Sequence, residues 1–260
     1  MKILVHQTLP AFCDIAANVA TIAATCRSAA GLQVDVVVFP EFFLTGYNLG
    51  SALNDVAIVT DGPVVAELCA IAQITGTAII VGFPERSGTD LFNTAIAITA
   101  DGRVAALHRK VFLFGAGEKR QFRAGDDFPV FDLAGHRCGL SICYDIEFPE
   151  VTRGLRQRGA TVVFVPTANM VPYYDVPTTL VRARALENGL VIVYANLCGV
   201  EGAQRYTGQS AVVAPDGNDL CRAGADDAIL IVDIAPALSR NSRNPVSNQI
   251  DDLYIIQAGR

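Results

Sequence analysis

The chain has 260 residues, of which 51% are hydrophobic, so it is long enough for one large domain or two small ones with a sizeable core. The formal net charge of −6 argues against a nucleic-acid partner. No apolar run reaches the roughly 18 residues that a membrane span needs, and the N-terminal stretch MKILVHQTLP turns polar too early for a signal peptide. The seven cysteines, an odd number with no CxxC pair, indicate reduced thiols in a cytoplasmic protein.

The first half of the chain predicts apolar strands that alternate with helices. Residues 35–40 form a continuous β-branched run, which is typical of a strand covered on both faces. Asp14 is a candidate N-cap for a helix with one buried stripe. In order, the expected elements are strands at 2–7 and 35–40, helices at about 14–30 and 63–74, a strand at 77–85 and a hairpin around Asp101-Gly102.

The second half continues the same alternation after a stretch at 111–129 that is rich in glycine and charge. Loops of that length are usually functional or disordered, and Phe112, Phe114 and Phe122 favour a packed, irregular loop. The expected elements are a strand up to Cys143, a helix at about 148–158, a strand at 161–170, a helix from about 176 to 188, a strand at 190–199, a hairpin around Asp216-Gly217 and a last core strand at 228–234. The pattern predicts one α/β domain over residues 1–260, with mixed sheets covered by helices.

Three of these strand ends carry residues that form a coherent chemical set: Glu41, Lys110 and Cys143. Taken singly, they are a turn glutamate, an edge lysine and a core cysteine, since free cysteine is often buried. Taken together, a buried carboxylate can accept the proton of a thiol, and an ammonium can stabilise an oxyanion. His108, two residues before Lys110, is expected to have a structural role.

The same residues carry a resemblance to a known family. FPEFFLTGY around Glu41, HRKVFLF around Lys110 and GLSICYDIEFPE around Cys143 resemble, in order and spacing, the three signature blocks of the nitrilase (carbon–nitrogen hydrolase) superfamily. The resemblance implies that Glu41 is the general base, Lys110 the oxyanion stabiliser and Cys143 the nucleophile. It also implies that Glu118 is the family's second glutamate, which orients the lysine and the substrate.

The resemblance covers nearly the whole chain and carries further expectations. It implies a four-layer α-β-β-α sandwich, a cysteine thioester intermediate, and no metal or organic cofactor. It also implies a homodimer, or a higher homo-oligomer, built through the helices at about 148–158 and 177–188. The expected partner is a small-molecule amide substrate, with no nucleic acid and no membrane.

Several stretches, among them FLTGYNLG, ICYDIEFPE and VPTANMVPYY, look closest to aliphatic amidases of the 5-aminopentanamidase type. The backbone N–H of Tyr144 is expected to help hold the oxyanion. Glu147 is a candidate for binding a substrate ammonium; a salt bridge at a dimer seam or a cap for the next helix is equally open. Tyr47 and Asn169 are expected pocket walls, with packing or turn roles as the alternative.

Other functions remain open beside amide hydrolysis. N-carbamoyl amine hydrolysis and nitrile hydrolysis belong to the same superfamily, and a catalytically silent binding protein with this fold is the alternative from another class. The stretch GLSIC lacks the last glycine of a nucleophile elbow, which disfavours Ser141 as the nucleophile. GAGEKR lacks the third glycine and the βαβ setting of a dinucleotide site.

Overall fold

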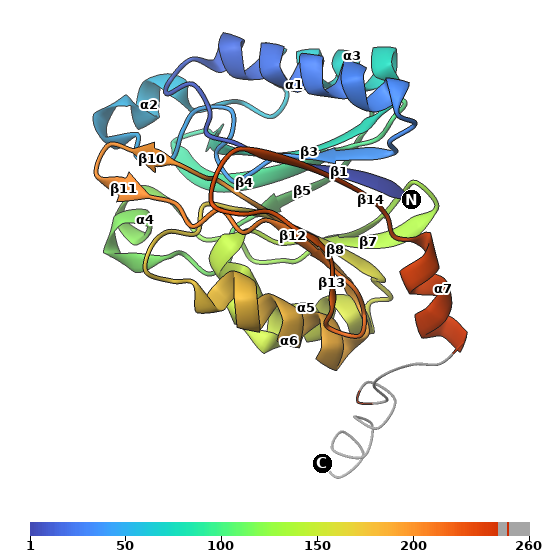
Figure 1. Ribbon diagram of the computed structural model, residues 1–260. Helices are drawn as coiled ribbons and strands as arrows, with labels where there is room; N and C mark the ends of the chain where they lie inside the picture. Colours follow the sequence, from blue (N-terminus) through green and yellow to red (C-terminus); the bar gives the residue numbers. More distant parts are fainter. Residues whose placement is uncertain (244–248, 250–260) are drawn as a thin grey trace.

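The computed structural model describes residues 1–243 and 249, and it contains two six-stranded sheets packed face to face (Figure 1). The first sheet has the order β14 (Ala228–Asp233), β1 (Lys2–Gln7), β2 (Val36–Val38), β3 (Ala78–Ser87), β4 (Asp90–Ile98) and β5 (Val104–Arg109). The second has the order β13 (Asp219–Arg222), β12 (Ala211–Val213), β9 (Val191–Asn196), β8 (Val162–Thr167), β7 (His136–Leu140) and β6 (Val130–Leu133).

Helices cover the outer face of each sheet and complete four layers. The outer layers are α1 (Ile15–Gly31) and α3 (Pro63–Thr75) over the first sheet, and α5 (Pro149–Gln157) and α6 (Val181–Asn188) over the second (Figure 1). The expected four-layer α-β-β-α sandwich is therefore confirmed. Within the described part of the chain, no helix combines the length and the apolar character needed to cross a membrane.

The two sheets have the same arrangement of strand directions, and this arrangement determines where the carboxyl ends of the strands lie. Each has three parallel strands at its centre, β1-β2-β3 and β7-β8-β9, extended by antiparallel neighbours. Because β4 is antiparallel to both β3 and β5, the carboxyl end of β5 lies at the same edge as that of β2. Open α/β sheets bind their ligands at the carboxyl ends of parallel strands, so this edge is the natural place for a site.

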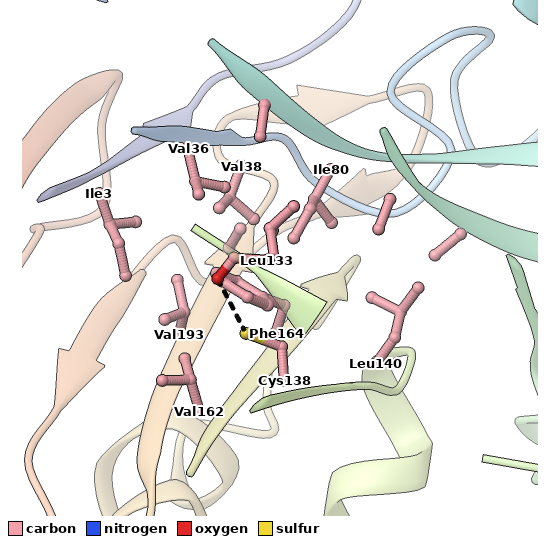
Figure 2. Close-up of a cluster of buried hydrophobic side chains, with 14 of the residues drawn as sticks. Ile3, Val36, Val38, Ile80, Leu133, Cys138, Leu140, Val162, Phe164 and Val193 are labelled. Atoms are coloured by element: carbon pink, nitrogen blue, oxygen red, sulfur yellow. Dashed lines mark hydrogen bonds between the residues drawn. The ribbon is translucent and has the colours of Figure 1, made fainter. Parts of the chain in front are cut away.

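The layer between the sheets is filled by apolar side chains that are cut off from solvent (Figure 2). Val36 and Val38 point into this layer, whereas Val37 between them packs under the helices. This alternation explains why residues 35–40 read as a continuous apolar run, since both faces of the strand are covered. Across the layer lie Phe164 of β8 and Cys138 of β7, the latter buried as expected.

Two expectations from the sequence are wrong in part. The stretch 111–129 is not irregular throughout, because α4 (Gly115–Gln121) forms within it, with the Glu118 carboxylate accepting from Phe114 N at 2.6 Å. β14 is an edge strand rather than a core strand, with Ile229 55% and Ile231 42% exposed. The short elements that the sequence did not indicate are the 3₁₀ helix η1 (Gly50–Ala52), α2 (Leu53–Val56), β10 (Val200–Glu201), β11 (Gln204–Arg205), β6 and α7 (Ala235–Arg243).

Candidate active site

The carboxyl ends of strands from both sheets bring the predicted residues together. Glu41 follows β2, Lys110 follows β5, and Cys143 follows β7 at the start of a tight 3₁₀ turn, Cys143–Glu147. The two sheets touch here, since Glu41 N lies 3.4 Å from Thr167 O at the end of β8. Residues that are far apart in the chain thus share one edge of the sandwich.

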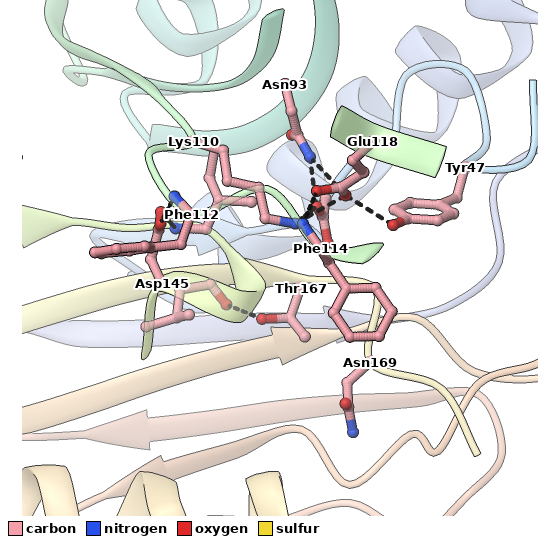
Figure 3. Close-up of polar contacts among 12 residues, drawn as sticks. Tyr47, Asn93, Lys110, Phe112, Phe114, Glu118, Asp145, Thr167 and Asn169 are labelled. Carbon is pink, nitrogen blue, oxygen red and sulfur yellow. Dashed lines mark hydrogen bonds and ion pairs between the residues drawn. The ribbon is translucent and has the colours of Figure 1, made fainter. Parts of the chain in front are cut away.

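Lys110 is the centre of a buried polar cluster (Figure 3). Its Nζ donates to Glu41 Oε1 at 2.8 Å and to Glu118 Oε1 at 2.9 Å, and the lysine and Glu41 side chains are fully buried. Asn93 Nδ2 donates to Glu41 Oε1 at 2.6 Å, and Tyr47 Oη donates to Glu118 Oε1 at 2.7 Å. An ammonium has three N–H donors, so the described residues use two of them and leave one.

The other oxygen of Glu41 has a different environment. Glu41 Oε2 is buried and makes no hydrogen bond to any described residue. A buried carboxylate oxygen without a donor is costly, and such atoms in native structures need an explanation. An oxygen that must receive a proton during a reaction is one such explanation.

The backbone around Glu41 packs so closely against β3 that only glycine fits at position 82. A Cβ added to Gly82 of β3 would lie 2.7 Å from Glu41 Cα and 2.8 Å from Phe42 N. Only glycine lets the neighbouring strand approach that closely. Phe42 itself has a positive φ of 53°, which turns the chain sharply after the carboxylate.

The charges of the cluster shift one another in opposite directions. Burial raises the pKa of the Glu41 carboxyl, although Lys110 beside it acts the other way. Burial also disfavours the Lys110 ammonium, but Glu41 and Glu118 outweigh it and hold its pKa well above the usual value. Burial, reinforced by the Glu41 charge, raises the pKa of the Cys143 thiol against the effect of Lys110. The cluster therefore pairs a protonated lysine with a neutral thiol at rest.

Cys143 faces a narrow pocket that contains all four expected substrate-binding residues. The pocket is lined by Tyr47, Phe114, Cys143, Tyr144, Glu147, Ala168, Asn169, Met170 and Tyr173. Its free volume is about 10 Å³, which is space for about one water. It adjoins a wider cleft of about 410 Å³ that shares Tyr47, Phe114 and Met170 as walls. The structure places these residues at the thiol, and their roles toward substrate stay predictions.

Asn169 and Tyr47 also make hydrogen bonds that hold the surrounding structure in place. Asn169 Nδ2 donates to Tyr173 O at 2.9 Å and to Thr207 Oγ1 at 3.0 Å, which ties down the loop after β8. Tyr47 is held through its hydroxyl by Glu118. Both interpretations from the sequence, pocket wall and packing residue, thus describe part of what these side chains do.

Glu147 lines the same pocket, and its carboxylate makes no hydrogen bond to a described residue. Its carbonyl oxygen accepts from Arg184 Nη2 at 2.6 Å, but no described residue makes a hydrogen bond to its carboxylate. The suggested helix cap is wrong, because Phe148 is the N-cap of α5 and the Glu147 carboxylate accepts no hydrogen bond from the described residues of that helix. Burial raises the pKa of this carboxyl, with Lys110 and Arg184 opposing the shift.

Three polar residues of the site were not predicted from the sequence. Asn93 Nδ2 donates to Glu41 Oε1, and its one signal in the sequence is an amide inside a mostly apolar strand. Asp145 bonds across the sheets to the segment around Lys110. Glu201 accepts from Tyr47 N at 3.0 Å and from Asn48 N at 2.7 Å, which anchors the loop that carries Tyr47; nothing in its sequence context indicates this contact.

Comparison with known proteins agrees with this geometry. The pattern of the carbon–nitrogen hydrolase family matches residues 5–244. The chain belongs to this family. It is 43% identical over 246 residues to a protein of Pseudomonas protegens described as a hydrolase in the pqqF 5′ region, covering 94% of this chain and 86% of that one. It is 35% identical to an (R)-stereoselective amidase of a Pseudomonas species, covering 90% of this chain and 85% of that one.

Solved structures give the same answer at the level of the fold. An amidase from Nesterenkonia sp. superposes on this carbon–nitrogen hydrolase with a TM-score of 0.84 at 33% identity, covering 93% of this chain and 96% of that one. A mutant of the Nesterenkonia sp. AN1 amidase carries the acetamide moiety of fluoroacetamide on its active-site cysteine, and it superposes with a TM-score of 0.85 at 33% identity over 94% of this chain and 96% of that one. This chain is thus a carbon–nitrogen hydrolase whose similar proteins include amidases.

Proposed function

We propose that the protein hydrolyses the C–N bond of a small aliphatic or amino-acid-type primary amide through a thioester on Cys143. The observation that carries this proposal is the buried cluster in which Lys110 bridges Glu41 and Glu118 beside the thiol pocket. A folded scaffold gains little from burying two carboxylates and an ammonium, because their desolvation penalty is large. The cost makes sense where the charges perform chemistry.

In the first half-reaction, Cys143 Sγ attacks the amide carbon while Glu41 Oε2 accepts the thiol proton. The raised pKa of the thiol makes this proton transfer necessary, and the raised pKa of Glu41 makes it a stronger base than an exposed glutamate. The third N–H of Lys110 and the backbone N–H of Tyr144 hold the oxyanion. The C–N bond then breaks as Glu41 returns the proton to nitrogen, which releases ammonia and leaves a thioester.

In the second half-reaction, Glu41 takes a proton from a water molecule that attacks the thioester carbon. The tetrahedral intermediate collapses with loss of the sulfur, which recovers its proton from Glu41. The carboxylic acid leaves and gives its proton to water, which yields the carboxylate product. Glu118 and Tyr47 keep Lys110 in place throughout. No step needs a metal or an organic cofactor. The acetamide adduct on the active-site cysteine of the Nesterenkonia sp. AN1 amidase supports a covalent route here.

Within the substrate class, we propose that the far end of the preferred amide carries an ammonium. Glu147 supplies a half-buried carboxylate, hydrogen-bonded to no described side chain or backbone group, four residues from the nucleophile. Aromatic rings of Phe114, Tyr144 and Tyr173 line the same pocket. A desolvated carboxylate and aromatic faces both favour a cation. An ω-amino amide should therefore have a higher kcat/KM than an uncharged amide of equal length.

The Glu147→Gln variant tests this subsite. It should lower the preference for the ω-amino amide by roughly 10- to 100-fold, which corresponds to the 1.5–3 kcal/mol of a hydrogen bond to a charged group. Glu150→Gln, an exposed glutamate in the first turn of α5, is the matched control and should leave the preference unchanged. Equal specificity constants in the wild type, or no change in Glu147→Gln, would argue against a cation site.

N-carbamoyl amines and nitriles are the alternative substrates of the same machinery. A panel of amides, N-carbamoyl compounds and nitriles, followed by ammonia release, separates them. The amidase proposal expects turnover of primary amides to dominate. Faster turnover of nitriles or N-carbamoyl amines would replace it, and no turnover of any class would favour a binding protein.

We also propose a cytoplasmic homodimer built through α5 and α6, the outer layer of the second sheet. The seven cysteines are all unpaired, which suits a reducing compartment. Leu186 of α6 is 40% exposed, although it is a large apolar residue on an outer helix. Sedimentation equilibrium should give twice the mass of the chain, and a monomer at micromolar concentration would contradict the dimer.

A further inference from the structure

A buried histidine–aspartate pair lies directly behind the Cys143 turn. His108 of β5 and Asp145 of the turn are 1% and 0% exposed, and His108 Nε2 lies 2.8 Å from Asp145 Oδ2. β5 belongs to the first sheet and the turn follows β7 of the second, so this contact joins the two sheets beside the site. Neither residue lines the pocket in front of the thiol.

The Asp145 carboxylate connects the lysine segment with the cysteine turn. Its Oδ1 accepts from Phe112 N at 2.9 Å, and its Oδ2 accepts from Ile142 N at 3.0 Å as well as facing His108. Figure 3 shows Asp145 beside Phe112, next to the lysine. His108 and Phe112 stand two residues before and two residues after Lys110. One carboxylate therefore contacts the His108 ring before the lysine, the backbone of Phe112 after it, and the backbone of Ile142 just before the nucleophile.

The cysteine turn needs such support. Cys143 has a φ of 45°, in the left-handed region that non-glycine residues rarely adopt. A residue held in such a sparsely populated region costs on the order of 1–3 kcal/mol and persists where its surroundings over-determine it. Asp145 closes the turn twice, because its own N–H donates to Ile142 O at 3.0 Å while its side chain accepts from Ile142 N.

The partners of the two His108 ring nitrogens indicate the protonation state of the ring. Nε2 faces the Asp145 carboxylate, and Nδ1 faces the backbone oxygen of Asp127 at 3.1 Å. With Asp145 ionised, both partners are acceptors, and a ring that donates to both of them carries two N–H groups, which is the imidazolium. Phe128 also packs on the ring, with centroids 5.2 Å apart. The Asp127 carboxylate interacts electrostatically with His108 and accepts from Arg158 Nη1 at 2.7 Å.

From these contacts we infer that His108 and Asp145 form a buried ion pair that positions the two halves of the oxyanion site relative to each other. One half is Lys110 on the first sheet, and the other is the Cys143–Tyr144 turn on the second. The inference rests on the proposed function, which assigns Lys110 and the backbone N–H of Tyr144 as the groups that hold the oxyanion. His108 and Asp145 are positioning residues, because they act through the lysine and the turn and do not contact the pocket.

Asp145→Asn tests the positioning role with little change in shape. The asparagine amide turns an N–H₂ toward at least one of the N–H donors that the carboxylate now serves, so the turn and the lysine segment separate. A misplacement of about 1 Å costs up to roughly 100-fold in rate, so kcat should fall by about that factor while KM changes less than about threefold. Asp127→Asn is the matched control: it removes a carboxylate near His108 but keeps the backbone oxygen, and kcat should stay unchanged.

Nitrogen NMR of the three histidines gives a readout that does not depend on turnover. In the wild type at neutral pH, both ring nitrogens of His108 should carry protons, and the signal is assigned by its loss in His108→Gln. In Asp145→Asn the ring should become neutral.

A neutral His108 in the wild type, or wild-type kcat in folded Asp145→Asn, would overturn the inference. Should Asp145→Asn fail to fold, His108→Gln, which keeps one donor toward Asp145 but no charge, should lower kcat, and wild-type kcat there would overturn it equally. Absence of amide turnover in the wild type would instead overturn the proposed function, while the NMR result still decides on the ion pair.

Discussion

Two parts of the layer between the sheets are equally inaccessible to water and chemically opposite. In the apolar part, Val38, Phe164 and Val193 have no exposed surface. In the polar part, at the carboxyl ends of the strands, Glu41 and Lys110 have none either. Burying a large apolar side chain contributes roughly 1.5–3 kcal/mol to stability, whereas an ion in the interior loses several kcal/mol of solvation that its partner must restore.

The comparison shows that burial has two uses in this molecule. The apolar part holds the sheets together, and its side chains need only fit. The polar part uses the same exclusion of water to shift the pKa values of Glu41, Lys110 and Cys143. Substitutions in the first part should therefore change stability and leave the chemistry intact, and substitutions in the second should do the reverse.

The largest expected effect is the difference in kcat between two alanine variants, Cys143→Ala in the polar part and Cys138→Ala in the apolar part. Cys143→Ala should lower kcat by on the order of 10⁴-fold or more, because it removes the nucleophile, and the protein should stay folded. Cys138→Ala removes a fully buried thiol from the apolar part and should leave kcat unchanged while lowering stability by about 1 kcal/mol. Steady-state ammonia release and thermal melting of both variants make the comparison. Wild-type turnover in folded Cys143→Ala would refute the assignment of the nucleophile.

A core truncation should show the opposite pattern. Phe164→Ala leaves a cavity between the sheets and removes none of the charged groups, and it should lower the free energy of unfolding by about 3–5 kcal/mol. Below its melting transition the variant should keep wild-type kcat. Urea unfolding with activity assays at low denaturant measures both quantities. A fall in kcat that matches the Cys143 variant would mean that the two parts of the layer are not separable.

The pH profile gives the smallest effect and tests the polar part without mutation. Glu41 must be deprotonated to act as a base, and burial raises its pKa, so its protonated form persists to higher pH than in an exposed glutamate. The specificity constant for an uncharged amide should fall about tenfold per pH unit on the acid side, with a midpoint above the ordinary value of about 4.3. Lys110 has a pKa well above its usual value and should not cause an alkaline loss near neutral pH. A midpoint at or below the ordinary glutamate value, in protein shown to be folded, would contradict this assignment.

The sequence marks the three site residues because each stands at the end of a predicted strand. Glu41 follows the apolar run 35–40, Lys110 ends the second strand of the hairpin around Asp101-Gly102, and Cys143 ends a strand in which apolar and smaller residues alternate. The carboxyl ends of these strands meet in space. Asn93 and Asp145 escape prediction because their partners lie on other strands, 52 residues away for Asn93 and Glu41 and 37 for Asp145 and His108. No local pattern encodes such contacts.

The errors in secondary structure have similar causes. Residues 228–234 are nearly all apolar, so the sequence shows no alternation that would reveal an exposed face, and β14 reads as a core strand. The glycines of GAGEKRQ hide α4, since glycine disfavours helices, and the helix is supported instead by the buried Glu118. Tertiary contacts decide both elements.

The most direct test is a mass measurement on the enzyme during turnover. Rapid acid quenching with an amide substrate, followed by digestion, should find the acyl group on the peptide that contains Cys143 and on none of the other six cysteines. The adduct should form at the rate of the first ammonia released and disappear when the substrate is exhausted. Ammonia release with no adduct on Cys143, or with the acyl group on another residue, would contradict thioester chemistry at the buried polar part of the sandwich.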